Sequence, residues 1–110
     1  MATVAVQDKF AEVLIAFGDL QEGVDAALQR YTIDQIGTKI TELQRKNAKY
    51  QSRYGLEYPE FSRRVAGDEE FVRHIETNIN KMWEVDLADW EFCYKGIEDW
   101  TKKLRNILLT

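Results

Sequence analysis

The feature that most constrains the fold is an apolar seam between residues 82 and 108. Its members follow one another at alternating spacings of four and three residues. They are Trp83, Leu87, Trp90, Tyr94, Ile97, Thr101, Leu104 and Leu108. Only Thr101 is a weak position, so the pattern predicts one long amphipathic helix of heptad type. Such a helix needs a surface on which to bury its seam, and the remaining chain must supply it.

The predicted C-terminal helix is also acidic and rich in tryptophan. Between its aromatic residues lie Glu84, Asp86, Asp89, Glu91, Glu98 and Asp99, against the single cation Lys95. All three tryptophans of the chain, Trp83, Trp90 and Trp100, fall in this stretch. Tryptophan is enriched at the centres of protein interfaces. We expect Trp90 in the core and at least one of Trp83 and Trp100 partly available to a partner.

A second apolar stripe predicts another long helix that ends at Tyr54. It runs through Ile33, Ile36, Ile40, Leu43, Asn47, Tyr50 and Tyr54. Gly37 is a candidate break, because glycine costs a helix interior about 1 kcal/mol relative to alanine. Asn47 would fix the register if it paired with a like residue. Gly55 is placed to end the helix with a left-handed cap.

The stretch between the two long helices predicts a compact corner. Pro59 is suited to the first turn of a short helix that reaches Ala66. Gly67 ends that helix, and Asp68 is placed to cap the next one. The apolar stripe then slips by one residue near Trp83, which implies a bend. Residues 36–110 are therefore predicted to form an antiparallel long-helix hairpin with a short-helix corner, and the fold class is all-α.

Residues 1–35 predict a separate N-terminal helical segment that is a candidate for dimerisation. Residues 1–6 are short, nearly uncharged and tolerant of strand structure, and a helix follows from Gln7 to Phe17. After Gly18, Asp19 and Glu22 have the spacing of a capping box for a second helix. The simpler alternative is two helices with a frayed N-terminus.

Composition limits the environment of the chain. No apolar run approaches the roughly 18 residues that span a bilayer, and no signal-peptide pattern begins the sequence. The single cysteine, Cys93, excludes an internal disulfide and a cysteine zinc site and suits a reducing compartment. We therefore expect a cytoplasmic protein without a membrane partner. The net charge of −4 disfavours general nucleic-acid binding.

The residues that carry chemistry are too few for an enzyme. His74 is the only histidine, and Cys93 lies in a predicted helix centre, so both are assigned surface or packing roles. Asp86 and Asp89 share a helical face, but Glu42 is the only facing carboxylate that would complete a cation site. We expect no catalytic residue, no metal and no cofactor.

A basic and aromatic stripe on the predicted second helix permits two interpretations. Its members are Arg45, Lys46, Lys49, Arg53, Tyr50 and Tyr54. Cations interleaved with aromatic rings are typical of single-stranded nucleic-acid binding. Tyr50 and Tyr54 are seam residues, however, so we favour buried rings and cations that neutralise the acidic helix within the hairpin.

Three segments carry a resemblance to a known group of proteins: K-Y-Q-S-R-Y-G-L-E-Y-P-E-F from residue 49, W-E-V-D-L-A-D-W-E-F from residue 83 and I-E-D-W-T-K-K-L from residue 97. Together they resemble small helical prokaryotic antitoxins of type II toxin–antitoxin pairs, over roughly residues 40–108. The resemblance implies a protein-binding module whose C-terminal helix neutralises a cognate basic toxin. The implied partner-binding residues are Trp83, Glu84, Asp86, Asp89, Trp90, Glu91 and Trp100.

The N-terminal third is similar to ribbon-helix-helix repressors in its order of a short extended piece, a helix, a Gly-Asp turn and a helix. This similarity implies that a strand from Ala2 to Val6 pairs with its copy in a dimer and enters the DNA major groove. Thr3 and Lys9 are then the candidate nucleic-acid contacts. Two alternatives to the antitoxin reading therefore stand: a helical structural or oligomerisation subunit of a larger assembly, and a DNA-binding regulator.

Overall fold

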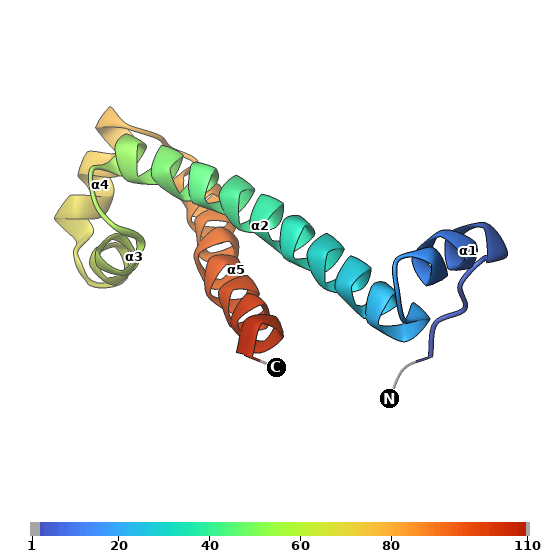
Figure 1. Ribbon diagram of the computed structural model, residues 1–110. Helices are drawn as coiled ribbons and strands as arrows, with labels where there is room; N and C mark the ends of the chain where they lie inside the picture. The colour runs from blue at the N-terminus through green and yellow to red at the C-terminus, as the bar shows by residue number, and fades with distance from the viewer. Residues whose placement is uncertain (1–2, 110) are drawn as a thin grey trace. The chain divides into compact units, whose positions relative to one another are not determined.

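Residues 3–109 are described by the computed structural model, and within them the chain forms five α-helices and no strand (Figure 1). The helices are α1 (Asp8–Ala16), α2 (Leu20–Tyr54), α3 (Tyr58–Gly67), α4 (Glu69–Asn78) and α5 (Trp83–Leu109). The predicted all-α class is confirmed. The chain divides into two compact units, residues 1–35 and 36–110, and each is described by itself.

Helix α2 is longer than the two helical stretches expected from the sequence. It runs unbroken through Gly37, so the expected break there is wrong. Two other expectations hold. The Asp19 carboxylate accepts a hydrogen bond of 3.0 Å from the backbone N–H of Glu22 at the start of α2. At its end Gly55 adopts a φ of 72°, and its N–H donates to the carbonyl of Gln51.

The predicted corner is formed by α3 and α4. Pro59 lies in the first turn of α3, where its missing N–H costs no helical hydrogen bond. The Asp68 carboxylate caps α4 by accepting a 3.1 Å hydrogen bond from the N–H of Phe71. Helix α4 ends at Asn78, and α5 begins only at Trp83. The expected interruption before the C-terminal seam is therefore confirmed.

An aromatic cluster forms the core of residues 36–110, and every helix of this unit from α2 to α5 contributes to it. Its buried members are Tyr50, Tyr54, Phe61, Ile75 and Trp90. Trp90 is 0 % exposed, and its ring centroid lies 5.2 Å from Phe61 and 5.9 Å from Tyr54. Each aromatic pair contributes about 0.5–1.5 kcal/mol beyond its area burial. This cluster fixes the start of α5 against α2 and the corner.

The residue pairs that join α2 and α5 show that the two helices are antiparallel. Tyr54 contacts Asp86, and Tyr50 contacts Asp89. Further along, a Cβ atom at Gly96 would lie 2.9 Å from Cδ1 of Leu43. Earlier positions of α2 thus meet later positions of α5, which is the register of the predicted antiparallel hairpin.

The N-terminal unit is built differently, because none of residues 3–35 is buried. Helix α1 rests on the start of α2, where a Cβ at Gly23 would meet the side chain of Leu14 at 3.3 Å. Residues 3–7 have no regular secondary structure. Of the strand expected from Ala2 to Val6, Ala2 lies outside the described residues. Pairing of this segment with a second copy stays a prediction.

Candidate functional site

The Asp86 carboxylate joins α5 to α2 and to the turn that precedes α5. Its Oδ2 accepts hydrogen bonds from the Tyr54 hydroxyl at 2.5 Å and the Arg53 Nη1 at 2.6 Å. It also accepts from the Asn80 amide at 3.0 Å. Burial alone would raise the pKa of Asp86, but these three donors outweigh it and hold the pKa below its usual range. Asp86 is therefore an internal anchor, and the partner contact expected of it from the sequence stays a prediction.

Asp89 repeats this arrangement one helical turn later. It accepts a 2.5 Å hydrogen bond from the Tyr50 hydroxyl, and Lys46 Nζ lies 3.7 Å away. Burial and the bond to Asp89 raise the pKa of the Tyr50 hydroxyl. Arg53 and Lys46 thus face the acidic helix, which is the interpretation favoured from the sequence. Both tyrosine rings are buried and are not available to stack on bases.

Trp90 lies at the centre of the core and is closed to a partner, so its place among the partner-binding residues is corrected. Its Nε1 donates a 2.7 Å hydrogen bond to Oδ1 of Asn47. Asn47 therefore pairs with an indole in this structure, so the condition under which it would fix the register, a like partner, is not met within the described chain. Cys93, one turn along, is fully buried, and burial raises the pKa of its thiol. It packs, as expected.

The other predicted partner residues lie at the surface. Trp83 and Trp100 are both half-buried, so each leaves part of its indole accessible. Trp83 packs against the aromatic cluster. Lys103 Nζ lies 4.4 Å from the ring centroid of Trp100. Glu84 is exposed, and Glu91 forms an ion pair of 2.6 Å with Lys95.

Sequence reasoning missed a second apolar face of α5, which we call the outer face. It consists of Val85, Ala88 and Phe92, spaced three and four residues apart and therefore on one side of the helix. Val85 is 60 % exposed and Phe92 65 % exposed. A shallow depression of about 330 Å³ lies beside Phe92. It is lined by Ala88, Glu91, Phe92, Lys95, Gly96 and Asp99.

The seven-residue spacing of Val85 and Phe92 was the signal available in the sequence. It was obscured because the longer tryptophan seam, on the opposite side of the same helix, accounts for more of the apolar residues. Helix α5 therefore buries one apolar side in the core and leaves a second apolar side exposed to solvent. The outer face is therefore the strongest candidate for contact with another molecule in residues 36–109.

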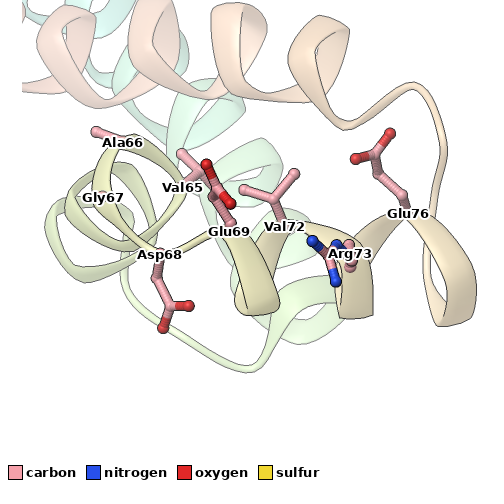
Figure 2. A pocket seen from close by; sticks show the side chains of 8 residues that line it. All are labelled: Val65, Ala66, Gly67, Asp68, Glu69, Val72, Arg73 and Glu76. Carbon is pink, nitrogen blue, oxygen red and sulfur yellow. The ribbon is translucent and has the colours of Figure 1, made fainter.

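The corner carries a larger but less promising hollow, of about 450 Å³. Figure 2 shows it lined by Val65, Ala66, Gly67, Asp68, Glu69, Val72, Arg73 and Glu76. One of its polar groups already serves the fold, because Asp68 caps α4 and lies 3.9 Å from Arg64. Within residues 3–109 no group of histidine, cysteine and carboxylate side chains is arranged to hold a metal ion.

The candidate nucleic-acid contacts are both exposed. Thr3 has no regular secondary structure around it. Lys9 lies on α1, with its Nζ 5.0 Å from the ring centroid of Phe10. Across the described residues, no helix has the length and apolarity required to cross a membrane.

We compared the chain with known protein families, with curated proteins and with solved structures, and no match was found in any of the three.

Proposed function

We propose that the chain is an antitoxin-like protein-binding module, and that the outer face of α5 binds a basic protein and blocks its active surface. The observation that carries this proposal is an exposed apolar stripe on a helix whose opposite side is already fixed in the core. Val85 and Phe92 gain nothing from solvent exposure, whereas each would stabilise a complex by about 1.5–3 kcal/mol if fully buried.

Charge supports a basic partner. Residues 83–94 of α5 hold four carboxylates and no cation. Two of them, Asp86 and Asp89, are neutralised by Arg53 and Lys46 within the hairpin. Glu84 remains exposed beside Val85 and has no counter-ion among the ion pairs of the described chain. An apolar stripe with a carboxylate at its edge matches a partner with an apolar hollow rimmed by lysine or arginine.

The fold would supply the second requirement of a neutralising helix, which is rigidity. Tyr50, Tyr54 and Asn47 hold α5 through Asp89, Asp86 and Trp90 before any partner arrives. Binding to a preformed helix avoids the conformational entropy of ordering it. The helix can then cover a substrate-binding surface of the toxin as one rigid body.

The test is co-expression of the chain with a small basic protein encoded by the neighbouring gene, followed by native mass measurement and titration. We expect a hetero-complex that Phe92→Ala weakens by about 30-fold or more, the range of an interface hot spot. Glu84→Lys should weaken it further and reduce its salt dependence. Leu109→Ala is the matched control, since Leu109 is also exposed on α5 but lies beyond the outer face.

Two results would contradict the proposal. One is a complex that tolerates both Phe92→Ala and Glu84→Lys. The other is a chain that binds only itself, which would favour the helical oligomerisation subunit. Charge reversal at Asp86 or Asp89 is unsuitable as a test, because these carboxylates accept hydrogen bonds from Tyr54 and Tyr50 and their loss would disturb the fold itself.

A further inference from the structure

Residues 3–35 expose most of their large apolar side chains. The exposed set is Val4, Phe10, Val13, Ile15, Phe17, Leu28 and Tyr31. Helix α1 contains no buried residue, although a Cβ at Gly23 of α2 would lie 3.3 Å from its Leu14. A nine-residue helix is marginal in water without tertiary packing. Residues 3–35 therefore lack a buried core of their own, and their apolar side chains are left without a surface to pack against.

Three of these exposed side chains, Phe10, Val13 and Phe17, lie on one side of α1. At 3.6 residues per turn, Phe10, Val13 and Phe17 fall within about one sixth of the helix circumference. The carboxylates Asp8 and Glu12 fall on the opposite side. Phe17 protrudes most, with 87 % of its side chain exposed. The three side chains of the stripe are themselves uncharged, and the one cation next to them is Lys9, whose Nζ lies 5.0 Å from the ring centroid of Phe10.

An apolar groove lies next to this stripe in the same unit. It has a volume of about 350 Å³ between residues 4–7, α1 and the first turns of α2. It is lined by Val4, Ala5, Val6, Gln7, Phe10, Leu14, Val24, Ala27 and Leu28. Not one of these side chains is charged. The unit therefore offers both a protruding aromatic ring and an uncharged hollow.

We propose that residues 3–35 form a two-fold symmetric interface with a second copy of this chain. In it the stripes of Phe10, Val13 and Phe17 pack on each other, and Phe17 of each copy enters the groove of the other. A two-fold interface uses the same patch on both subunits, so the contact between Phe17 of one copy and the groove of the other is formed twice. This inference is independent of the outer face of α5.

The exposed area fits a dimer of ordinary size. Phe10, Phe17 and Tyr31 are between 54 % and 87 % exposed. With about 150–250 Å² for each aromatic side chain, these three alone offer roughly 400 Å². The exposed aliphatic side chains Val4, Val13 and Leu28 add to this figure, whereas Ile15 lies on the opposite side of α1. The sum is comparable with the approximately 800 Å² that each partner buries in a standard interface.

The carboxylates of this unit lie outside the proposed contact between copies. Residues 1–35 hold six carboxylates and two cations, so they account for the whole net charge of −4. None of these carboxylates lines the groove, and none lies in the stripe of α1. A cationic partner would find no counter-ion at the apolar contact. A second copy needs none, and its acidic outer sides remain in solvent.

The test is sedimentation equilibrium of the full chain across a concentration series, with two variants matched in helix and exposure. Val13 is 56 % exposed and Ile15 57 % exposed, but they lie on opposite sides of α1. We expect wild type to dimerise. Val13→Asp should weaken the dimer about 100-fold, because a charge is buried in each half at a cost of at least about tenfold. Ile15→Asp should change it by less than about threefold.

Salt provides an independent readout. Because both copies are acidic here, 0.5 M NaCl should strengthen the dimer relative to 0.05 M NaCl. The same change should weaken the binding of a basic partner to the outer face. A chain that stays monomeric would overturn the inference. So would equal effects of Val13→Asp and Ile15→Asp at unchanged helicity, or a dimer that dissociates in salt.

Discussion

The anchor at Asp86 allows a quantitative test of how α5 is held. Asp86→Asn keeps the size of the side chain and one acceptor oxygen but removes the negative charge that three donors share. Hydrogen bonds to a charged group contribute about 1.5–3 kcal/mol each. The Arg53 bond contributes less, about 0–1 kcal/mol, because the Arg53 side chain is 37 % exposed. The Tyr54 and Asn80 bonds persist in weakened form with a neutral acceptor. We expect a loss of about 2–3 kcal/mol in the free energy of unfolding.

The assay is urea denaturation followed by tryptophan fluorescence, since Trp90 lies in the same core. Glu84→Gln is the control. Glu84 also lies in the first turn of α5, so both substitutions lose the favourable interaction with the helix dipole, about 0.3–1 kcal/mol. Only Asp86 has the three donors. A second cycle with Tyr54→Phe should show a coupling of about 1–2 kcal/mol between Tyr54 and Asp86.

The pH dependence has a defined sign. The pKa of Asp86 is lower in the folded chain than in the unfolded chain, so its contribution is complete above the unfolded value of about 3.9. It is lost as pH falls from there through the folded value. The difference between wild type and Asp86→Asn should therefore be constant near pH 7 and shrink in acid. Equal losses for Asp86→Asn and Glu84→Gln, or a difference that persists in acid, would refute this account.

Two further predictions concern glycines and tyrosines. Gly37→Ala should stabilise the chain by about 0.5–1 kcal/mol, because nothing lies within 4 Å of its Cβ position. The Gly96→Ala variant should be less stable than the Gly37→Ala variant by at least about 0.5 kcal/mol in the same thermal melts, since a Cβ at Gly96 would lie 2.9 Å from Leu43. Equal stability of the two variants would contradict the close contact of α2 with α5. Burial, followed by the bonds to Asp89 and Asp86, raises the pKa of the Tyr50 and Tyr54 hydroxyls in the folded chain. Their stabilisation is thus complete below the unfolded value of about 10 and is lost as pH rises from there toward the folded values, so Tm should fall as pH rises above about 10, and the double replacement by Phe should reduce this fall.

Local signals in the sequence predicted the elements well where one physical cause dominates. Gly55 ends α2 because a left-handed residue is required there, and Asp68 caps α4 through its own carboxylate. Gly37 misled because its cost is only about 1 kcal/mol, which the flanking turns of a 35-residue helix outweigh.

Pairings across the hairpin were harder to predict, because they depend on which side chains meet in space. Asn47 at a heptad position suggested a like partner, yet the facing residue is Trp90, whose buried indole N–H needs an acceptor. The carboxylates of α5 could be counted in the sequence, but not divided into those facing Tyr50 and Tyr54 and those in solvent. In the structure Asp86 and Asp89 accept hydrogen bonds from Tyr54 and Tyr50, which is a role within the fold that their spacing in the sequence did not reveal.

The same division explains how one helix can serve the fold and a partner at once. The tryptophan seam and the two aspartates hold α5 through contacts within residues 36–110, and they leave Val85 and Phe92 on the opposite side. Substitutions on the outer face should therefore weaken binding to a partner with little effect on stability. Substitutions at Asp86 should lower the stability of the fold and, through the fold, weaken binding as well. A Phe92→Ala variant that unfolded as easily as Asp86→Asn would show that Phe92 supports the fold in solution, and the outer face would then lose its claim to a partner.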